Sequence, residues 1–239
     1  MTTKTGTERD VAEYRHLMMS AFADFSTLDE TELQVARGGG RELLRVGRPL
    51  APAELAGALG LPIERVDEIL RRHAEMGFVY FNGEDRVQAM WAVGGIDAGH
   101  RITVDGQTGP TWCALDTLLL PIWWGAEAAV TSRDPLTGRG ISLTVGPDGV
   151  TDLVPANAVV SAYEPEGPVT QDVRASFCEF VNFFESAETA AEWASRQEGR
   201  RFRFLAVEDA HAWAADYVRS VFGRREGSAA TSRSGGTAA

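Results

Sequence analysis

Residues 53–87 constrain the fold most, because this stretch joins two short helical patterns to a hairpin signal. A Gly-Leu-Pro turn separates the two helical patterns, and an alternating strand then ends at Asn82-Gly83, a dipeptide typical of hairpin turns. The predicted segments are a helix at 53–59, a turn at Gly60-Leu61-Pro62, a helix at 63–76, a strand at 77–81 and its return through Val87. Two helices followed by a hairpin are typical of a winged helix, so we predict a winged-helix-like unit over residues 41–95.

A winged helix commonly binds DNA, so a regulator is one interpretation of this unit. Between residues 37 and 90, however, eight arginines are balanced by eight acidic residues, and acidic residues outnumber arginines on the second predicted helix. Binding to nucleic acid needs an excess of positive charge. We therefore interpret the unit as a packing and lid element.

The rest of the chain divides around this unit. Residues 1–40 read as a polar leader followed by an amphipathic helix, and Gly38-Gly39-Gly40 predicts a break or linker after it. The apolar residues of that helix recur at helical spacing, namely Val11, Tyr14, Met18 and Phe22. Residues 96–222 are expected to form a mixed second domain. Residues 223–239, rich in Ser, Gly, Ala and Thr, are expected to be a disordered tail.

The mixed domain alternates short strands with helices. Strands are expected at 90–93, 101–104, 128–132, 140–145, 158–163, 180–184 and 202–207, with a hairpin loop at 134–138. Helices are expected at 112–120 (stopped near Pro121), from an Asp172 cap through Ser176, at 187–197 and at 209–222. The pattern predicts an α+β fold, in which small antiparallel sheets pack with helices.

Charge and hydropathy exclude several classes of function. The chain has 239 residues, 44% of them hydrophobic, with a net charge of −11 and an isoelectric point near 4.9. Nucleic acids and anionic membranes repel such a chain, so we expect neither as a partner. No apolar run approaches a membrane span, and the N-terminus carries no apolar signal core. We expect a soluble, cytoplasmic protein.

The two cysteines, Cys113 and Cys178, stand in polar-flanked segments far apart in the sequence. If the segment from Trp112 is helical, Asp116 lies on the same face as Cys113, three residues away. Two thiols and one carboxylate make a poor zinc site but suit a very soft ion such as mercury(II). The carboxylate can then take a proton from a thiol and deliver it to a leaving group.

Two other interpretations of the cysteines stay open at this point. Buried cysteines often serve as small hydrophobic core residues. A disulfide is disfavoured, because nothing in the N-terminal sequence indicates an oxidising compartment. From the residues alone, the two cysteines are therefore either core residues or part of a metal or catalytic site.

The chain resembles the organomercurial (alkylmercury) lyases over residues 49–222. The resemblance rests on these motifs: Trp112-Cys113-Ala114-Leu115-Asp116-Thr117-Leu118, Thr137-Gly138 with Ile141-Ser142-Leu143-Thr144-Val145, Val173-Arg174-x-Ser176-Phe177-Cys178, Phe183-Phe184-x-Ser186, Ala191-Glu192-Trp193-Ala194 and Val207-Glu208-x-Ala210. The first of these is long enough to be specific.

The resemblance implies protonolysis of a carbon–mercury bond in alkyl- and arylmercury compounds, giving a hydrocarbon and mercury(II). It implies that Cys113 and Cys178 are the catalytic cysteines and that Asp116 is the catalytic aspartate. It implies the same three residues as ligands of the mercury ion. It also implies small thiols for turnover and a mercuric reductase as the recipient of mercury(II). Where some family members carry a further cysteine after the second catalytic one, this chain has Glu179.

The competing hypothesis is a thiol-based soft-metal binding protein or sensor for mercury or copper, without lyase activity. Asp116 distinguishes the two, because binding needs only sulfur whereas protonolysis needs an acid. His100 and the pair Trp123-Trp124 are secondary candidates for shaping the site. The sequence has no phosphate loop, dinucleotide fingerprint or nucleophile elbow, so we expect no organic cofactor.

Overall fold

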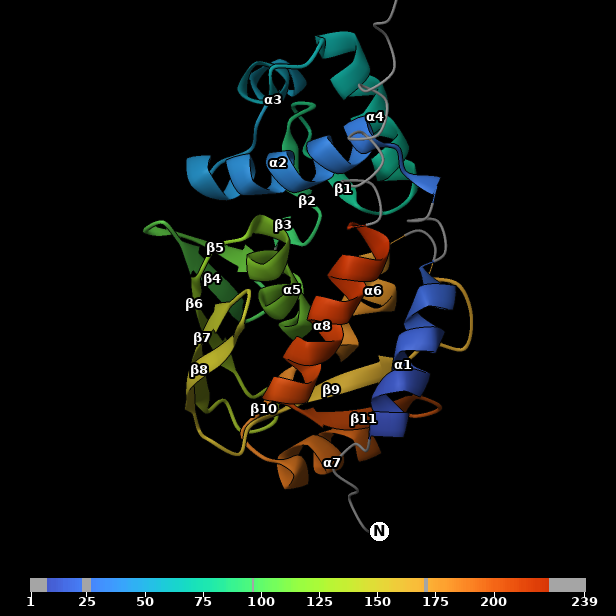
Figure 1. The fold of residues 1–239 in the computed structure, drawn as a ribbon, viewed down its shortest axis with the longest axis vertical. Helices are drawn as coiled ribbons and strands as arrows, with labels where there is room; N and C mark the ends of the chain where they lie inside the picture. The colour runs from blue at the N-terminus through green and yellow to red at the C-terminus, as the bar shows by residue number, and fades with distance from the viewer. Residues whose placement is uncertain (1–7, 23–26, 96, 170–171, 224–239) are drawn as a thin grey trace, which may run out of the picture.

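The computed structural model describes residues 8–22, 27–95, 97–169 and 172–223. Residues 1–7 of the predicted leader and residues 224–239 of the predicted tail lie outside that part of the chain. Within it, the chain forms the predicted α+β fold, with two antiparallel sheets (Figure 1). The larger sheet has the strand order β1-β2-β3-β5-β4-β6-β7-β8, and the smaller has the order β10-β9-β11.

Strands and helices follow one another along the described chain. The strands are β1 (Val79–Phe81), β2 (Val87–Met90), β3 (Val93–Gly94), β4 (His100–Val104), β5 (Gln107–Thr111), β6 (Ala128–Arg133), β7 (Gly140–Gly146), β8 (Gly149–Val154), β9 (Val159–Glu164), β10 (Phe183–Phe184) and β11 (Arg201–Ala206). The helices are α1 (Glu8–Ala21), α2 (Glu30–Val46), α3 (Pro52–Leu59), α4 (Ile63–Glu75), α5 (Ala114–Trp124), α6 (Val173–Ser176), the 3-10 turn η2 (Cys178–Phe180), α7 (Ala187–Ser195) and α8 (Val207–Val221).

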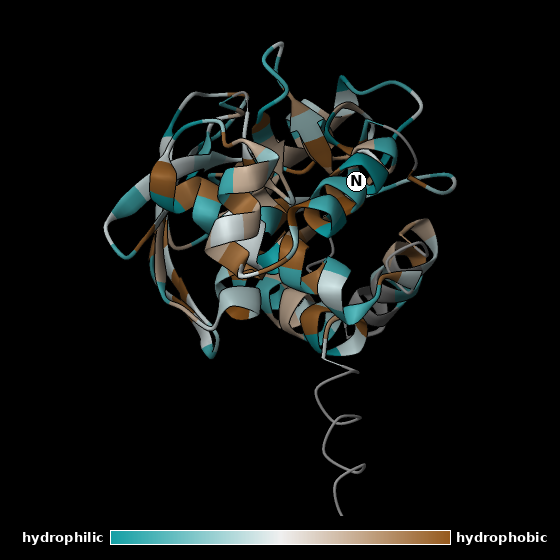
Figure 2. Cartoon of the chain, turned by 90° about the horizontal axis from the view of Figure 1, so that it is seen from above, coloured by the Kyte–Doolittle hydropathy of each residue, from teal (hydrophilic) through white to brown (hydrophobic). Residues whose placement is uncertain are grey.

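Helices α5 and α8 pack against each other, with α1 alongside α8 (Figure 1). Helix α5 packs against strands of the larger sheet, and α8 packs against the smaller sheet and against β8 of the larger one. Helices α2 to α4 lie beyond β1 to β3 at one end of the molecule. Seen from that end, the helices alternate hydrophilic and hydrophobic segments, as expected when one face of each helix enters the core (Figure 2). The buried apolar residues form one core cluster that extends through both ends.

Helix α2 corrects the predicted break at Gly38-Gly39-Gly40, because these glycines lie inside a continuous helix. The helix begins with a capping box between Asp29 and Glu32 and ends at Gly47 with φ 68°. A Cβ at Gly39 would lie 2.6 Å from the Cε of Met90, which is far closer than van der Waals contact. The glycines therefore let the helix approach the sheet rather than interrupting it. The helix also runs across residue 40, where the sequence predicted a domain boundary.

The predicted strand at 90–93 is wrong, because Trp91 and Ala92 form a two-residue turn between β2 and β3. Their φ angles are 44° and 75°, and Met90 pairs directly with Val93 across the turn. Trp and Ala are uncommon in such turns, so the sequence contains no signal for a turn at this position.

Helix α5 does not stop near Pro121 as predicted but continues to Trp124, with Gly125 as its left-handed C-cap. Proline removes one backbone hydrogen bond from a helix interior. Pro121 itself is buried, as are Leu120, Trp123 and Trp124 of the same helix. Burial of this apolar face outweighs the local cost of the proline.

Three further differences concern strands. β5 and β8 were not predicted, since Gly109-Pro110 and Asp152 are poor strand formers. The predicted strand at 180–184 is mostly wrong: its first part belongs to η2, and only β10 pairs with β9. The remaining predicted helices and strands of the mixed domain are present with small shifts at their ends.

No helix among the described residues is long and apolar enough to span a membrane.

Candidate active site

Cys113 lies at the start of α5, where its extended backbone (φ −153°, ψ 174°) makes it the N-cap residue. The backbone N–H of Ala114 donates to the carbonyl oxygen of Val181 at 3.0 Å. The start of α5 is therefore tied to the segment that follows Cys178. Asp116 stands in the first turn of α5, where a carboxylate can face back toward the N-cap residue.

Cys178 begins η2, directly after the short helix α6. Asp172 caps α6 as predicted, because its side chain accepts the N–H of Ala175 at 3.2 Å. The same carboxylate accepts the hydroxyl of Tyr80 at 2.8 Å. Strand β1 thus helps to hold the segment that carries the second cysteine.

The fold brings together all three predicted site residues. Cys113, Asp116 and Cys178 each offer a ligand atom, and these atoms lie within 4.8 Å of one another. Both cysteines are free thiols and are buried, at 1% and 4% exposure. A disulfide is thereby excluded in this structure. Two sulfurs and one carboxylate oxygen at this separation suit a soft ion.

Burial keeps both thiols protonated. It raises the pKa of Cys113 well above its ordinary value, and the adjacent Cys178 thiol and the Asp116 charge act in the same direction. For Cys178, the hydrogen bond with Cys113 lowers the pKa, but burial and the Asp116 charge outweigh it and the net direction is upward. Neither thiolate therefore exists in quantity before a ligand draws the proton away.

Asp116 is the group that can take such a proton. Burial raises its pKa from 3.8 to about 7, although hydrogen bonds from the thiol and the backbone N–H of Cys113 oppose the rise. The residue as a whole is half-buried, whereas its Oδ2 is enclosed and has no hydrogen-bond partner among the residues that the structure describes. A carboxyl group with a pKa near neutrality can act as base and then as acid.

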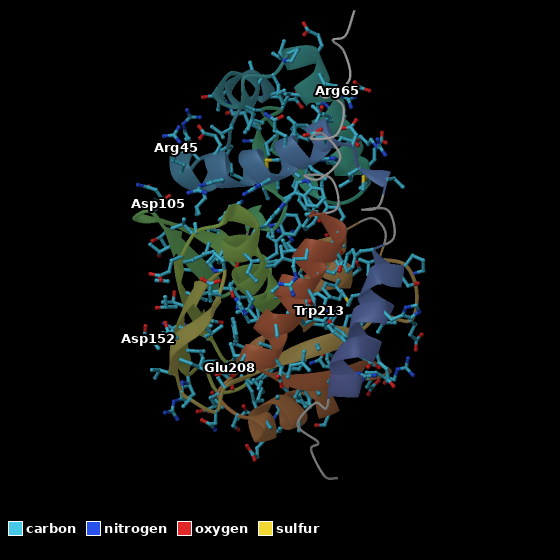
Figure 3. The ribbon with its side chains drawn as sticks, in the orientation of Figure 1. Arg45, Arg65, Asp105, Asp152, Glu208 and Trp213 are labelled. Atoms are coloured by element: carbon cyan, nitrogen blue, oxygen red, sulfur yellow. The ribbon has the colours of Figure 1, made fainter. Side chains whose placement is uncertain are left out.

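The three residues line a cavity of about 90 Å³ whose other walls are almost entirely apolar. Most of these walls are aromatic, and among them are Trp91, Trp112, Trp123, Phe177, Trp213 and Phe222. Trp213 lies on α8 (Figure 3) and lines the cavity. It packs against Tyr14 of α1, with ring centroids 5.5 Å apart. Such an apolar lining suits an organic group.

Of the secondary candidates, Trp123 lines the cavity, whereas Trp124 and His100 do not. Trp123 lines the cavity and stacks on Phe222 at 4.4 Å. Trp124 does not line it, and its indole N–H donates to the carbonyl oxygen of Arg37. His100 is buried outside the cavity between Ser132 and Asn182, and burial lowers its pKa to about 4.

Sequence reasoning missed the wall residues supplied by distant elements. Trp91 and Trp213 lie far from both cysteines in the sequence and carry no motif. The helical spacing of Met18 and Phe22 marked them as one apolar face, and both line the cavity. That spacing indicates burial, but it cannot indicate which site the face covers.

Comparisons with known proteins identify relatives of this chain in sequence and in fold. The alkylmercury lyase family model matches residues 96–219. An alkylmercury lyase of Pseudomonas putida is 36% identical over 192 residues, covering 78% of this chain and 81% of the relative. An alkylmercury lyase of Staphylococcus epidermidis is 33% identical over 169 residues, covering 71% of this chain and 74% of the relative. The crystal structure of the mercury-bound form of MerB2 matches 90% of this chain and 100% of its own with a TM-score of 0.69, and at 17% identity it indicates a shared fold.

Proposed function

Because this chain belongs to the alkylmercury lyase family, we propose that Cys113, Asp116 and Cys178 cleave the carbon–mercury bond of organomercurials by protonolysis. The products are a hydrocarbon and mercury(II). The observation that carries the proposal is the meeting of two buried thiols and one carboxylate within 4.8 Å. Mercury is the substrate's own metal here and not a resident cofactor.

The first step is capture of the organomercurial by a thiol. Mercury(II) binds thiolate far more tightly than oxygen ligands, so it displaces the thiol proton even though the pKa of each thiol is raised. When the second thiol also binds mercury, Asp116, if ionised, lies within reach to accept the proton of that second thiol. The ligand X of the substrate R–Hg–X departs with one of the two thiol protons.

The second step is protonation of carbon. Two sulfurs on mercury push electron density toward the organic group, which makes its carbon more basic. Neutral Asp116 then donates the second thiol proton to that carbon as the C–Hg bond breaks, and its electron pair forms the new C–H bond. The balance is R–Hg–X plus two thiols giving R–H, HX and mercury held by Cys113 and Cys178. A positioned proton transfer of this kind typically contributes about 10²–10⁴-fold in rate.

Release of mercury(II) completes the cycle. Two buried thiolates hold the ion tightly, so small external thiols are required to exchange it out, and a mercuric reductase is the proposed recipient. No organic cofactor takes part in the proposed reaction.

The test is hydrocarbon release from methylmercury by the purified, reduced protein with excess small thiol. The parent is expected to turn over, whereas Asp116→Ala and Cys178→Ser lose the activity. Asp105→Asn is a matched control, because Asp105 is an exposed carboxylate paired with Arg41 at 2.8 Å and does not line the cavity. Loss of activity in Asp105→Asn alone, or full activity in Asp116→Ala, would refute the assigned roles.

The second candidate is a soft-metal binding protein or sensor, which the two adjacent buried thiols alone would support. In that case the protein binds mercury(II) tightly, releases no hydrocarbon, and Asp116→Ala leaves binding unchanged. The orphaned Oδ2 of Asp116 favours the lyase, because a binder has no use for a buried carboxyl group that is costly to ionise.

We also propose that residues 41–95 act as a winged-helix-like packing unit that does not bind DNA. The order of helices α3 and α4 followed by the β1–β2 hairpin supports the comparison with a winged helix. Each arginine of α4 already has an acidic partner: Arg65 with Asp29 (2.7 Å), Arg71 with Asp85 (2.6 Å) and Arg72 with Glu32 (2.6 Å). Retention on DNA at low salt would contradict this role.

We also propose a cytoplasmic location, because the thiol chemistry of the site requires reduced cysteines. Both site cysteines must stay reduced to capture mercury, and reducing compartments keep thiols free. Fractionation of cells expressing the full chain tests this location, and recovery outside the cytoplasm would contradict it.

A further inference from the structure

We infer that Trp91 limits the size of the organic group that the cavity accepts, so that a smaller side chain at this position raises the rate on arylmercury relative to alkylmercury substrates. The inference rests on the proposed function and concerns the substrate class of the same site. Its basis is the backbone of the turn that carries Trp91, the contacts that fix the indole ring and the volume that this ring leaves free.

The turn that carries Trp91 consists of two residues, Trp91 and Ala92, that are uncommon in hairpin turns. Met90 and Val93 pair across it, which leaves two central residues, and both have positive φ angles, 44° at Trp91 and 75° at Ala92. A two-residue hairpin turn with positive φ at both positions strongly prefers Asn-Gly or a similar pair. A bulky residue held in this region of φ is strained, and such strain is concentrated at functional sites.

Backbone hydrogen bonds hold the strained pair in place. The N–H of Trp91 donates to the carbonyl oxygen of Phe78 at 2.9 Å, and the carbonyl oxygen of Ala92 accepts the N–H of Trp112 at 3.2 Å. The second bond joins the turn to the residue immediately before Cys113. The position of the indole is therefore coupled to the start of the catalytic helix.

The indole ring itself is fixed on several sides. Its N–H donates to the Nδ1 of His73 at 3.0 Å, its face stacks on Phe78 at 4.8 Å, and it lies 6.0 Å from Trp123. Trp91 is only 5% exposed. A side chain held this firmly forms a rigid wall, not a flap that a large substrate moves aside.

The space that remains beside this wall is small. The cavity contains about 90 Å³, whereas an engineered apolar cavity that binds benzene in another protein has about 150 Å³. Mercury is held at the sulfurs, so the organic group must occupy the apolar part of the cavity near Asp116. The space beside the indole is therefore tighter for a phenyl ring than for a methyl group, and Trp91 is one of the walls that set this limit.

The test compares kcat/KM for phenylmercury and methylmercury in the parent, Trp91→Gly and Trp91→Phe. Glycine accepts the positive φ without strain and removes the wall, so the phenyl-to-methyl ratio is expected to rise roughly tenfold or more, in line with the discrimination that apolar pockets reach. Trp91→Phe retains a ring and is expected to shift the ratio in the same direction by less. Trp91→Phe also keeps the test valid if the glycine variant does not fold.

Trp124→Phe is the matched control. Trp124 is also a buried indole whose N–H donates a hydrogen bond, in its case to the carbonyl oxygen of Arg37, but it does not line the cavity. Its substitution is expected to leave the ratio within about twofold of the parent. A ratio that stays at the parent value in both Trp91 variants, or that moves equally in Trp124→Phe, overturns the inference. If the parent releases no hydrocarbon at all, the proposed function fails instead.

Discussion

Replacing Asp116 by Asn is expected to stabilise the protein at neutral and alkaline pH while abolishing its chemistry. The pKa of Asp116 is raised from 3.8 to about 7 by burial, so the folded protein binds a proton that the unfolded chain has already lost between these pH values. Stability is therefore fully present below pH 3.8 and falls as pH rises toward 7.

The magnitude follows from the displacement of the pKa. At about 1.36 kcal/mol for each tenfold change in proton affinity, ionising Asp116 reduces the free energy of unfolding by about 4 kcal/mol in total. Between pH 5 and pH 8 the expected loss is about 3 kcal/mol. Asparagine has the same shape and no charge to bury, so the variant lacks this loss.

The assay is denaturant unfolding of reduced parent and Asp116→Asn at pH 5 and pH 8. The stability advantage of the variant is expected to be about 3 kcal/mol larger at pH 8 than at pH 5. Asp105→Asn, at an exposed carboxylate, is expected to follow the parent at both pH values. A difference between Asp116→Asn and parent that is the same at both pH values would refute the reasoning, because Asp116 would then ionise as an ordinary carboxyl group.

Three further predictions concern the site and the packing. The kcat/KM for methylmercury should rise as pH increases through about 7 and then level, because the base must be ionised to accept a thiol proton; a rate that is flat from pH 5 to 8 would rule out Asp116 as that base. Gly39→Ala should lower the free energy of unfolding by about 1–3 kcal/mol, because its Cβ would lie 2.6 Å from Met90. Gly57→Ala, with no atom within 4 Å of the new Cβ, should raise it by about 0.5–1 kcal/mol. Thermal unfolding that ranks the two variants in the opposite order contradicts the packing of α2. Tyr14→Phe should unfold at the same or a higher temperature than the parent, because within the described part of the chain the buried Tyr14 hydroxyl has no hydrogen-bond partner. A loss of more than about 1 kcal/mol in the free energy of unfolding would mean that the hydroxyl has a partner in solution.

The sequence predicted those parts of the site that are local. Asp116 and Cys113 are three residues apart, so one turn of helix suffices to place them together. The cap at Asp172 is also local, and it positions the segment of Cys178. The meeting of the two cysteine segments is a long-range event, and it was predicted from the chemistry of a soft-metal site and from the family resemblance.

The parts that were not predicted depend on tertiary contacts. Gly38-Gly39-Gly40 has the composition of a linker, but its helix is stabilised by close approach to Met90, which lies far along the sequence. Pro121 is a helix breaker by local rules, yet the buried residues around it keep α5 helical. The turn at Trp91 has no turn residues, because its sequence serves the cavity. In each case the requirement of a distant contact overrides the local preference.

The central claim is that a thiol proton passes through Asp116 to the carbon bound to mercury. The most direct measurement is a single turnover of methylmercury by reduced protein in D₂O without external thiol, followed by mass spectrometry of the gas and titration of the remaining thiols. The account predicts one monodeuterated methane per mercury retained, with Cys113 and Cys178 both lost to titration. Mercury retained with its methyl group intact, while both thiols are occupied, would contradict it.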